Sequence, residues 1–210
     1  MKKKLRLKRF VLPMIYVILV FVFVMSTYAV FSARNDISEE EINYVSNIIW
    51  SNDTPVVSTD KVLQKPYSNE KVTIGRYYYN YKDESKNQQN AIIFYEGSYM
   101  QNTGVDYILD EKFEVLSVFD GTITKVENNE MVGKSVEVKH SNNIISVYQG
   151  LSEVNVKEGD TVTQGTKIGT SGTSKVNNNL GNHLHFELYV NGQVVNPEDC
   201  FNKKLNELQA

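Results

Sequence analysis

The stretch Gly181-Asn182-His183-Leu184-His185-Phe186-Glu187-Leu188-Tyr189-Val190 decides both the fold and the chemistry expected of this chain of 210 residues. His183 and His185 are two positions apart, so in a β-strand both side chains point to the same face. Imidazole is the commonest metal ligand among side chains, and the pair therefore predicts half of a zinc site. Asn191-Gly192, which follows directly, predicts a hairpin with a type I′ turn.

Short stretches of strand-forming residues, separated by turn signals, precede this tract. They are Val72–Ile74, Ala91–Tyr95, Glu114–Phe119, Gly121–Glu127, Lys134–His140, Ile144–Tyr148 and Thr166–Gly169, with His183–Val190 and Gln193–Val195 at the end. Many short strands without a long helix between them predict a mainly β, antiparallel sandwich or barrel. The polar stretch 82–90 is expected to be a hairpin loop, and residues 203–208 one short helical turn.

The N-terminal segment has the character of a membrane anchor. Six basic residues lie between positions 2 and 9, and the 22 residues of Phe10–Phe31 carry no charge. As a helix this run spans about 33 Å, enough for a hydrocarbon core of about 30 Å. The basic cluster places the N-terminus in the cytoplasm. The alternative is a signal peptide cleaved near Thr27-Tyr28-Ala29, but the run exceeds the usual apolar core of such peptides.

With either interpretation the remainder of the chain, 33–210, is exported. Without the six N-terminal basic residues, 16 basic residues face 25 acidic ones, a net charge of about −9. An acidic ectodomain argues against nucleic acid as a partner. Cys200 is the only cysteine, so no intrachain disulfide forms, which suits a Gram-positive cell envelope better than a secreted miniprotein.

The expected domain organisation has five parts. A cytoplasmic basic tail (1–9) precedes the transmembrane helix (10–31), and a stalk or linker (32–70) leads to the β domain (71–200) and a C-terminal tail (201–210). Ser38 and Glu41 fit a capping box, and apolar residues at helical spacing predict a short amphipathic stalk helix over about 39–50. Its apolar stripe would pack on its own domain, pair with a partner helix or lie on the membrane surface.

Five segments occur in an order that resembles the LytM/lysostaphin family of zinc endopeptidases, which cut peptide cross-links in peptidoglycan. The likeness covers about residues 95–197 and implies a LytM-like peptidase fold. The segments are Asn102–Asp106, Asp120–Ile123, Val138–His140 with Tyr148–Leu151, Val156–Gly172, and Gly181–Pro197.

The resemblance also implies where a metal site would lie. Active members hold zinc with a histidine, an aspartate four residues on, and the second histidine of His-x-His, positions that fall here on Asn102, Asp106 and His185. The catalytic helpers are the first histidine of His-x-His and one in a Tyr-x-His-Leu tract, which fall on His183 and Gly150. Asp106, His183 and His185 would then be vestigial.

Two of these five positions carry the wrong chemistry. The amide of Asn102 is a poor zinc ligand, and Gly150 has no side chain with which to move a proton. Loss of one such helper typically costs about 10²–10⁴ in rate. We therefore expect no bound cofactor, no functional catalytic residue and no measurable peptidase activity. His140 is expected to be a structural histidine rather than a replacement ligand.

The wider arrangement of tail, span, stalk and domain is similar to a narrower group, the stage II sporulation protein Q proteins. That likeness implies a non-catalytic, single-pass protein of the forespore membrane, active in sporulation and engulfment. Its ectodomain would bind the mother-cell membrane protein of stage III sporulation protein AH type in the intermembrane space, forming a transenvelope complex. The alternatives are a zinc-dependent peptidoglycan endopeptidase and a peptidoglycan-binding module that does not cut. The aromatic run Tyr77–Tyr79 is either a contact patch or part of the core.

Overall fold

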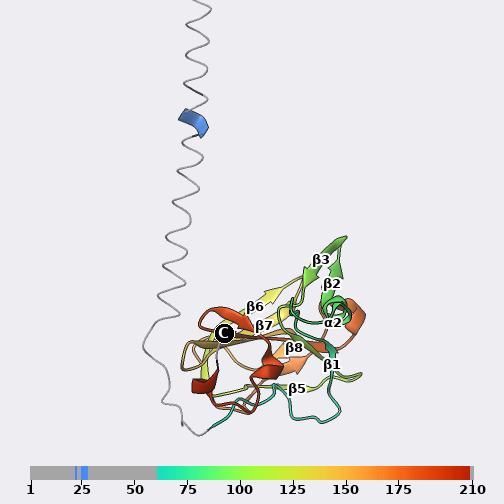
Figure 1. Cartoon of the computed structure of the whole chain (residues 1–210). Helices are drawn as coiled ribbons and strands as arrows, with labels where there is room; N and C mark the ends of the chain where they lie inside the picture. The colour runs from blue at the N-terminus through green and yellow to red at the C-terminus, as the bar shows by residue number, and fades with distance from the viewer. Residues whose placement is uncertain (1–21, 23–24, 28–60, 209–210) are drawn as a thin grey trace, which may run out of the picture. The chain divides into compact units, whose positions relative to one another are not determined.

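The computed structural model describes residues 22, 25–27 and 61–208 (Figure 1). Among these, Val22 and Met25–Thr27 are helical, and no helix is long and apolar enough to cross a membrane. The rest of the predicted transmembrane run and the whole predicted stalk helix lie outside the described residues. The chain divides into two compact units, 1–52 and 53–210. All that follows concerns the second unit.

Strands dominate the second unit, and its helices are short. The strands are β1 Thr73–Arg76, β2 Ile92–Tyr95, β3 Ser98–Gln101, β4 Val105–Ile108, β5 Glu114–Leu116, β6 Gly121–Asn129, β7 Gly133–Lys139, β8 Ile144–Val154, β9 Thr161–Val162, β10 Lys167–Ser171, β11 His183–Val190 and β12 Gln193–Val195. The helix α2 spans Ser85–Asn90, and the 3-10 turns are η1 Asn178–Leu180, η2 Pro197–Asp199 and η3 Leu205–Glu207.

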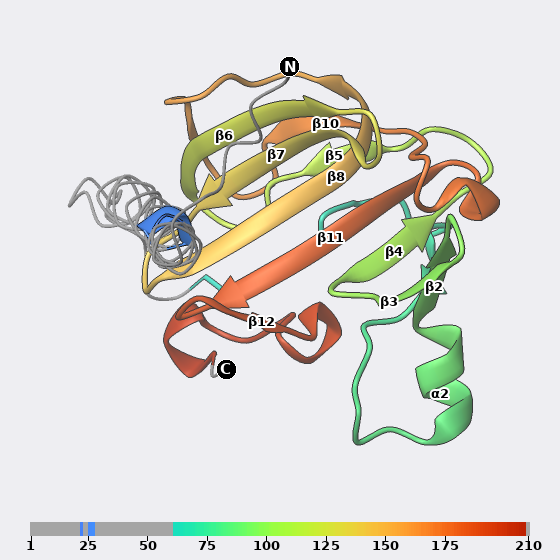
Figure 2. The same ribbon diagram turned by 90° about the horizontal axis from the view of Figure 1, so that it is seen from above.

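Ten of the strands form one antiparallel sheet, and β2 and β3 form a separate hairpin. The main path of the sheet is β1-β4-β11-β8-β7-β6-β9, with β12 paired to β11. The long strand β8 lies between β7 and β11 and also pairs with β10, which in turn pairs with β5 (Figure 2). The prediction of a mainly β, antiparallel fold is confirmed: ten strands form one branched sheet and two form a hairpin.

One hydrophobic core connects the strands of this sheet. It includes Val115 of β5, Ile123 of β6, Ile168 of β10 and Phe186 of β11, all with 1% exposure or less. The ring centroids of Tyr148 and Phe186 are 5.1 Å apart, and the Tyr148 hydroxyl accepts a hydrogen bond from the Val118 amide at 3.0 Å. The tyrosine thus fills the core with its ring while its polar end is satisfied.

Chain segments on both sides of the predicted domain 71–200 belong to the same core. Leu63 is completely buried, and its amide donates to the carbonyl of Lys203 at 2.9 Å. Phe201, Leu205 and Leu208 are also buried. The segment expected to be a linker and the segment expected to be a tail are therefore joined by backbone hydrogen bonds, and both supply apolar side chains to the core.

Two local predictions concern the turn after β11 and the loop before β2. Asn191 and Gly192 have φ values of 52° and 79°, as a type I′ turn requires, so that prediction is confirmed. The loop expected over 82–90 was wrong in part, because its second half forms α2. This helix buries none of its residues, so it has no apolar periodicity by which the sequence would reveal it.

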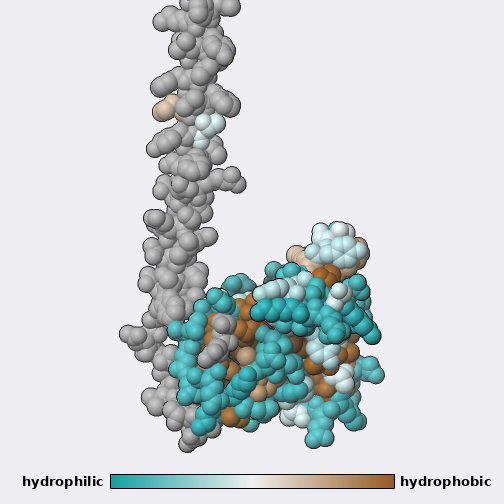
Figure 3. All heavy atoms as spheres, in the orientation of Figure 1, coloured by the Kyte–Doolittle hydropathy of each residue, from teal (hydrophilic) through white to brown (hydrophobic). Residues whose placement is uncertain are grey.

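The β2–β3 hairpin projects from the domain beside α2 (Figures 1 and 3). Ile93 and Met100 face each other across the hairpin, and Phe94 faces Tyr99. Phe94 and Tyr99 are 60% and 76% exposed, and their ring centroids are 4.9 Å apart. The aromatic pair stabilises the hairpin from outside the core.

We expect Leu63→Ala to lower the free energy of unfolding by about 2–5 kcal/mol, because it removes a fully buried side chain and leaves a cavity. Gln64→Ala is the matched control, since the neighbouring side chain is exposed and should change stability by no more than about 0.5 kcal/mol. Urea denaturation measures both. Equal stability of the two variants would mean that residues 61–63 are not part of the folded unit.

Candidate functional site

The site lies on one face of β11, where His183, His185 and Glu187 occupy alternate positions. The neighbouring β4 pairs His185 with Asp106 in register, and β8 pairs His185 with Gln149. All three residues are at most 8% exposed. The other face of β11 carries Leu184 and Phe186 into the core. Alternation along one strand therefore separates the polar site from the hydrophobic core.

Asp106 and His185 contact each other directly. Nδ1 of His185 lies 2.8 Å from Oδ1 of Asp106, which also accepts a hydrogen bond from the Asn177 amide at 3.1 Å. Nε2 of His185 lies 3.2 Å from Oε1 of Glu187. Thr103 donates a further hydrogen bond to the Glu187 carboxylate. Both ring nitrogens of His185 are thus engaged by carboxylates.

A cation from a different strand completes this arrangement. Arg76, the last residue of β1, is 8% exposed, and its Nη1 lies 3.7 Å from Oδ2 of Asp106. The guanidinium also donates a hydrogen bond to the side-chain oxygen of Asn177. We call Arg76, Asp106, His185 and Glu187 the charge network of the site.

His183 is hydrogen-bonded through both ring nitrogens and lies next to Gly150. Its Nδ1 donates to the carbonyl of Gly181 at 2.8 Å, and its Nε2 lies 3.0 Å from the Ser174 hydroxyl. Gly150 has a φ of 80°, and a Cβ at this position would lie 3.3 Å from Nε2 of His183. The structure thus brings the two helper positions together, as the resemblance implies, but with no side chain on one of them.

Asn102 is buried in the short loop between β3 and β4 and acts there as a structural residue. Its side-chain amide donates to the carbonyls of Tyr77 and Gly104 at 3.0 and 2.8 Å. Its backbone amide donates to Ala91, and its carbonyl accepts from Tyr79. Within the part of the chain that the structure describes, no group donates a hydrogen bond to the buried side-chain oxygen of Asn102 or to Oδ2 of Asp106. Asn102 therefore holds together the segments that enclose the site.

Burial and hydrogen bonding shift the pKa values of these groups in opposite directions. Burial disfavours charge on His185, but its two carboxylate partners outweigh burial and raise its pKa to about 9. Burial likewise opposes charge on Glu187, yet His185 and the surrounding donors lower its pKa to about 2. Burial lowers the pKa of His183, so this ring is neutral near pH 7. His185 and Glu187 form an ion pair over a wide pH range.

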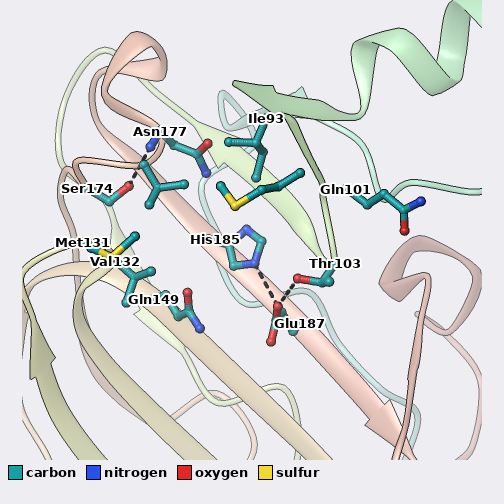
Figure 4. Close-up of a pocket in the computed structure, with 12 residues that line it drawn as sticks. Ile93, Gln101, Thr103, Met131, Val132, Gln149, Ser174, Asn177, His185 and Glu187 are labelled. Atoms are coloured by element: carbon teal, nitrogen blue, oxygen red, sulfur yellow. Dashed lines mark hydrogen bonds and ion pairs between the residues drawn. The ribbon is translucent and has the colours of Figure 1, made fainter. Parts of the chain in front are cut away.

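A cleft of about 310 Å³ opens over this face of the sheet (Figure 4). His185 and Glu187 lie in it, joined by a hydrogen bond. Its apolar lining includes Ile93 and Met100 of the hairpin and, opposite them, Met131 and Val132. The hairpin and the β6–β7 connection therefore form two sides of a groove that contains His185 and Glu187 of the charge network.

The residues at the metal positions do not fit a catalytic zinc ion. Such an ion needs three protein ligands and an open position. Asp106 and His185 are bonded to each other, Asn102 offers a neutral amide oxygen, and Arg76 brings positive charge beside the carboxylate. Among the described residues, no group of three or more histidine, cysteine, aspartate or glutamate side chains is arranged to hold a metal.

Sequence reasoning did not identify Arg76, Asn177 or Glu187 as site residues. No local pattern marked Arg76, because a register shift after Ile74 turns Arg76 to the face of β4 that carries Asp106. His140 was placed correctly: it is fully buried, its Nδ1 lies 2.9 Å from the Asp120 carbonyl, and burial lowers its pKa to about 4.

The fold and the site define a peptidase-type β domain with altered metal positions, and comparison with known proteins agrees. Peptidase family M23 matches residues 100–197. The peptidoglycan DD-endopeptidase ShyC of Vibrio cholerae is 37% identical over 48% of this chain, a match that covers 23% of that enzyme. This match thus covers about half of the present chain and less than a quarter of the enzyme.

Two further comparisons extend beyond the domain. Stage II sporulation protein Q of Bacillus subtilis is 30% identical over 96% of this chain and 74% of that protein. The solved structure of the SpoIIQ–SpoIIIAH pore-forming complex contains a chain that is 31% identical, with a TM-score of 0.69, over 71% of this chain and 96% of that one. The chain belongs to the stage II sporulation protein Q family.

The raised pKa of His185 predicts that stability falls with increasing pH. An unfolded histidine titrates near 6.5 and the folded one near 9, so this contribution is complete below pH 6.5 and is lost as pH rises through 9. We expect the free energy of unfolding to fall on the order of 2 kcal/mol across that window. His185→Gln should flatten this part of the profile, measured by urea denaturation from pH 6 to 9.5.

His140→Asn is the matched control for the pH profile. Burial lowers the pKa of His140 to about 4, so its removal should alter the profile below pH 6.5 and leave the alkaline slope in place. An unchanged alkaline slope in His185→Gln would show that His185 is not the titrating group.

We expect Gly150→Ala to destabilise the domain by about 2–3 kcal/mol, because it adds a strained left-handed φ and a contact with His183. Gly159→Ala is the matched control: its φ is 87°, but nothing lies within 4 Å of the added methyl, so only the backbone cost of about 1 kcal/mol applies. Chemical denaturation compares them. Equal losses would mean that the helper position accepts a side chain.

Proposed function

We propose that this chain is a non-catalytic interaction protein that forms a transenvelope complex with a SpoIIIAH-like partner during sporulation. The similarity to stage II sporulation protein Q extends over 96% of the chain and so includes the segment before the domain. The likeness to a chain of the SpoIIQ–SpoIIIAH complex covers nearly the whole length of that chain. Both observations support binding of the partner through the β domain.

The observation that carries the non-catalytic part of this proposal is the geometry of the altered site. Asp106 and His185 are bonded to each other and to further polar groups, so neither is left to hold a metal. Gly150, in the helper position, has a backbone conformation that side chains rarely adopt. An active peptidase would need a third ligand and a second helper that these residues do not supply.

The proposed protein is a single-pass component of the forespore membrane. Phe10–Phe31 would cross the membrane, with the basic N-terminal tail in the cytoplasm. The β domain would then face the space between the forespore and mother-cell membranes. An acidic domain with no disulfide suits an extracytoplasmic protein-binding role.

A second candidate is a module that binds peptidoglycan without cutting it. The cleft of about 310 Å³ supports this function, because it has apolar sides and hydrogen-bonding groups such as Gln149 and Glu187. Met100 lines the cleft and is 37% exposed, so a large charged side chain at this position would obstruct the cleft and distinguish the two candidate functions.

The test uses the full chain in lipid nanodiscs with the purified ectodomain of a SpoIIIAH protein. We expect saturable binding and co-elution, because association needs only a preformed domain surface. Met100→Arg, which obstructs the cleft, should leave partner binding unchanged if the cleft is not the interface. No complex at about 100 µM partner would contradict the proposal.

The same preparations should be incubated with purified sacculi and added zinc. We expect no released muropeptides, with ShyC as the active control. Sedimentation with sacculi that is lost in Met100→Arg would support the second candidate, and peptide release by the parent chain would support a peptidase.

A further inference from the structure

The buried carboxylate of Asp106 needs a compensating positive charge. Asp106 is completely buried, and a buried ionised carboxylate without a partner is strongly destabilising. Its Oδ1 is hydrogen-bonded by His185 and Asn177, whereas Oδ2 has no hydrogen-bond donor among the described residues. The fixed cation beside Oδ2 is Arg76, with Nη1 at 3.7 Å.

The fold places this arginine specifically. β1 and β4 pair with a register shift between Ile74 and Arg76, and the shift sets Arg76 directly opposite Asp106. Asn177 then connects the two side chains, since it accepts from the guanidinium and donates to the carboxylate. The register shift in the edge strand β1 and the bridging amide of Asn177 thus both orient the guanidinium of Arg76 toward the carboxylate of Asp106.

We propose that the guanidinium of Arg76 is the resident cation of this site, that it takes over the charge compensation a metal would give Asp106, and that it excludes a divalent ion. Loss of the ligand at Asn102 is then only half of the change that separates this site from a zinc site. The other half is the gain of a fixed positive charge on β1.

Two distances support exclusion of the metal. An ion bound to Oδ2 at a zinc–oxygen distance of about 2.0–2.2 Å would lie within about 6 Å of Nη1 of Arg76, where a guanidinium repels it strongly. Two ligands of a tetrahedral zinc ion are about 3.4 Å apart. Nδ1 of His185 and Oδ1 of Asp106 are 2.8 Å apart, a separation that suits a shared proton and not an ion between them.

The test measures zinc and cobalt binding to the full chain in nanodiscs by calorimetry and visible absorption. We expect Asn102→His alone to bind zinc within about tenfold of the parent, because the guanidinium remains. Arg76→Met combined with Asn102→His should bind at least about 100-fold tighter than Asn102→His and give the intense bands of tetrahedral cobalt. Arg76→Lys with Asn102→His retains the charge and should bind as weakly as Asn102→His.

Two results would overturn the proposal. One is tight zinc binding by Asn102→His alone or by the lysine control, since the charge would then not exclude the ion. The other is a folded Arg76→Met, Asn102→His double variant that binds zinc no better than Asn102→His.

A second measurement, without metal, applies even if the zinc variants fold poorly. Arg76→Met should lower the Tm by about 10 °C, because it leaves two buried carboxylates, Asp106 and Glu187, with His185 as their one remaining cation in the charge network. Adding Asp106→Asn removes one of these two charges and should recover at least about half of the loss, and Arg76→Lys should retain more of the Tm than Arg76→Met. No recovery by Asp106→Asn, or a Tm of Arg76→Met within about 2 °C of the parent, would show that Arg76 does not compensate this carboxylate.

Discussion

The antiparallel pairing of β11 with β4 is the constraint on which the rest of the structure depends. It sets His185 opposite Asp106 and, on the other face of β11, packs Leu184 and Phe186 into the core. Because side chains alternate along a strand, a slip of one residue would exchange the polar and apolar faces. The hydrophobic core therefore fixes the geometry of the polar site, and the two cannot vary independently.

The polar face retains the shape of a metal centre but has different chemistry. In the M23 fold a cation at this place would bind groups from β4, β11 and the loop between β3 and β4. Here Asp106 of β4 is instead hydrogen-bonded to His185 of β11 and to Asn177, and it lies beside Arg76 on β1. Under our proposal, charges balanced from within the chain would make the fold independent of a bound metal ion, which would suit a structural role in an envelope complex.

The surfaces around the site differ in character from the site itself. The cleft is lined by side chains of the projecting hairpin and of the β6–β7 connection. The outer face of the hairpin carries the exposed pair Phe94 and Tyr99. The domain therefore has more than one surface on which a partner could bind, and binding to either the cleft or the outer face of the hairpin requires no chemistry at the altered metal positions. This agrees with a family in which a peptidase fold is used for assembly.

Local sequence patterns determined most of the fold. Three local patterns were enough to predict a mainly β, antiparallel domain: the alternation in His183–Val190, the Asn191-Gly192 turn and the succession of short strands. Each pattern depends only on neighbouring residues. They also identified His183, Asp106, His185, Asn102 and Gly150 through their likeness to a family motif. The helix α2 and the burial of Leu63 were not predictable in this way, since neither has a periodic signature.

Only the tertiary structure decided how the altered site is stabilised. Arg76 lies 30 residues before Asp106 in the sequence, and Asn177 lies 71 residues after it. No local pattern connects them, because their contact depends on a register shift between β1 and β4 and on the path of the loop before η1. The sequence by itself determined that Asn102 replaces a metal ligand. Only the folded chain determined that the guanidinium of Arg76 lies beside the remaining carboxylate of Asp106.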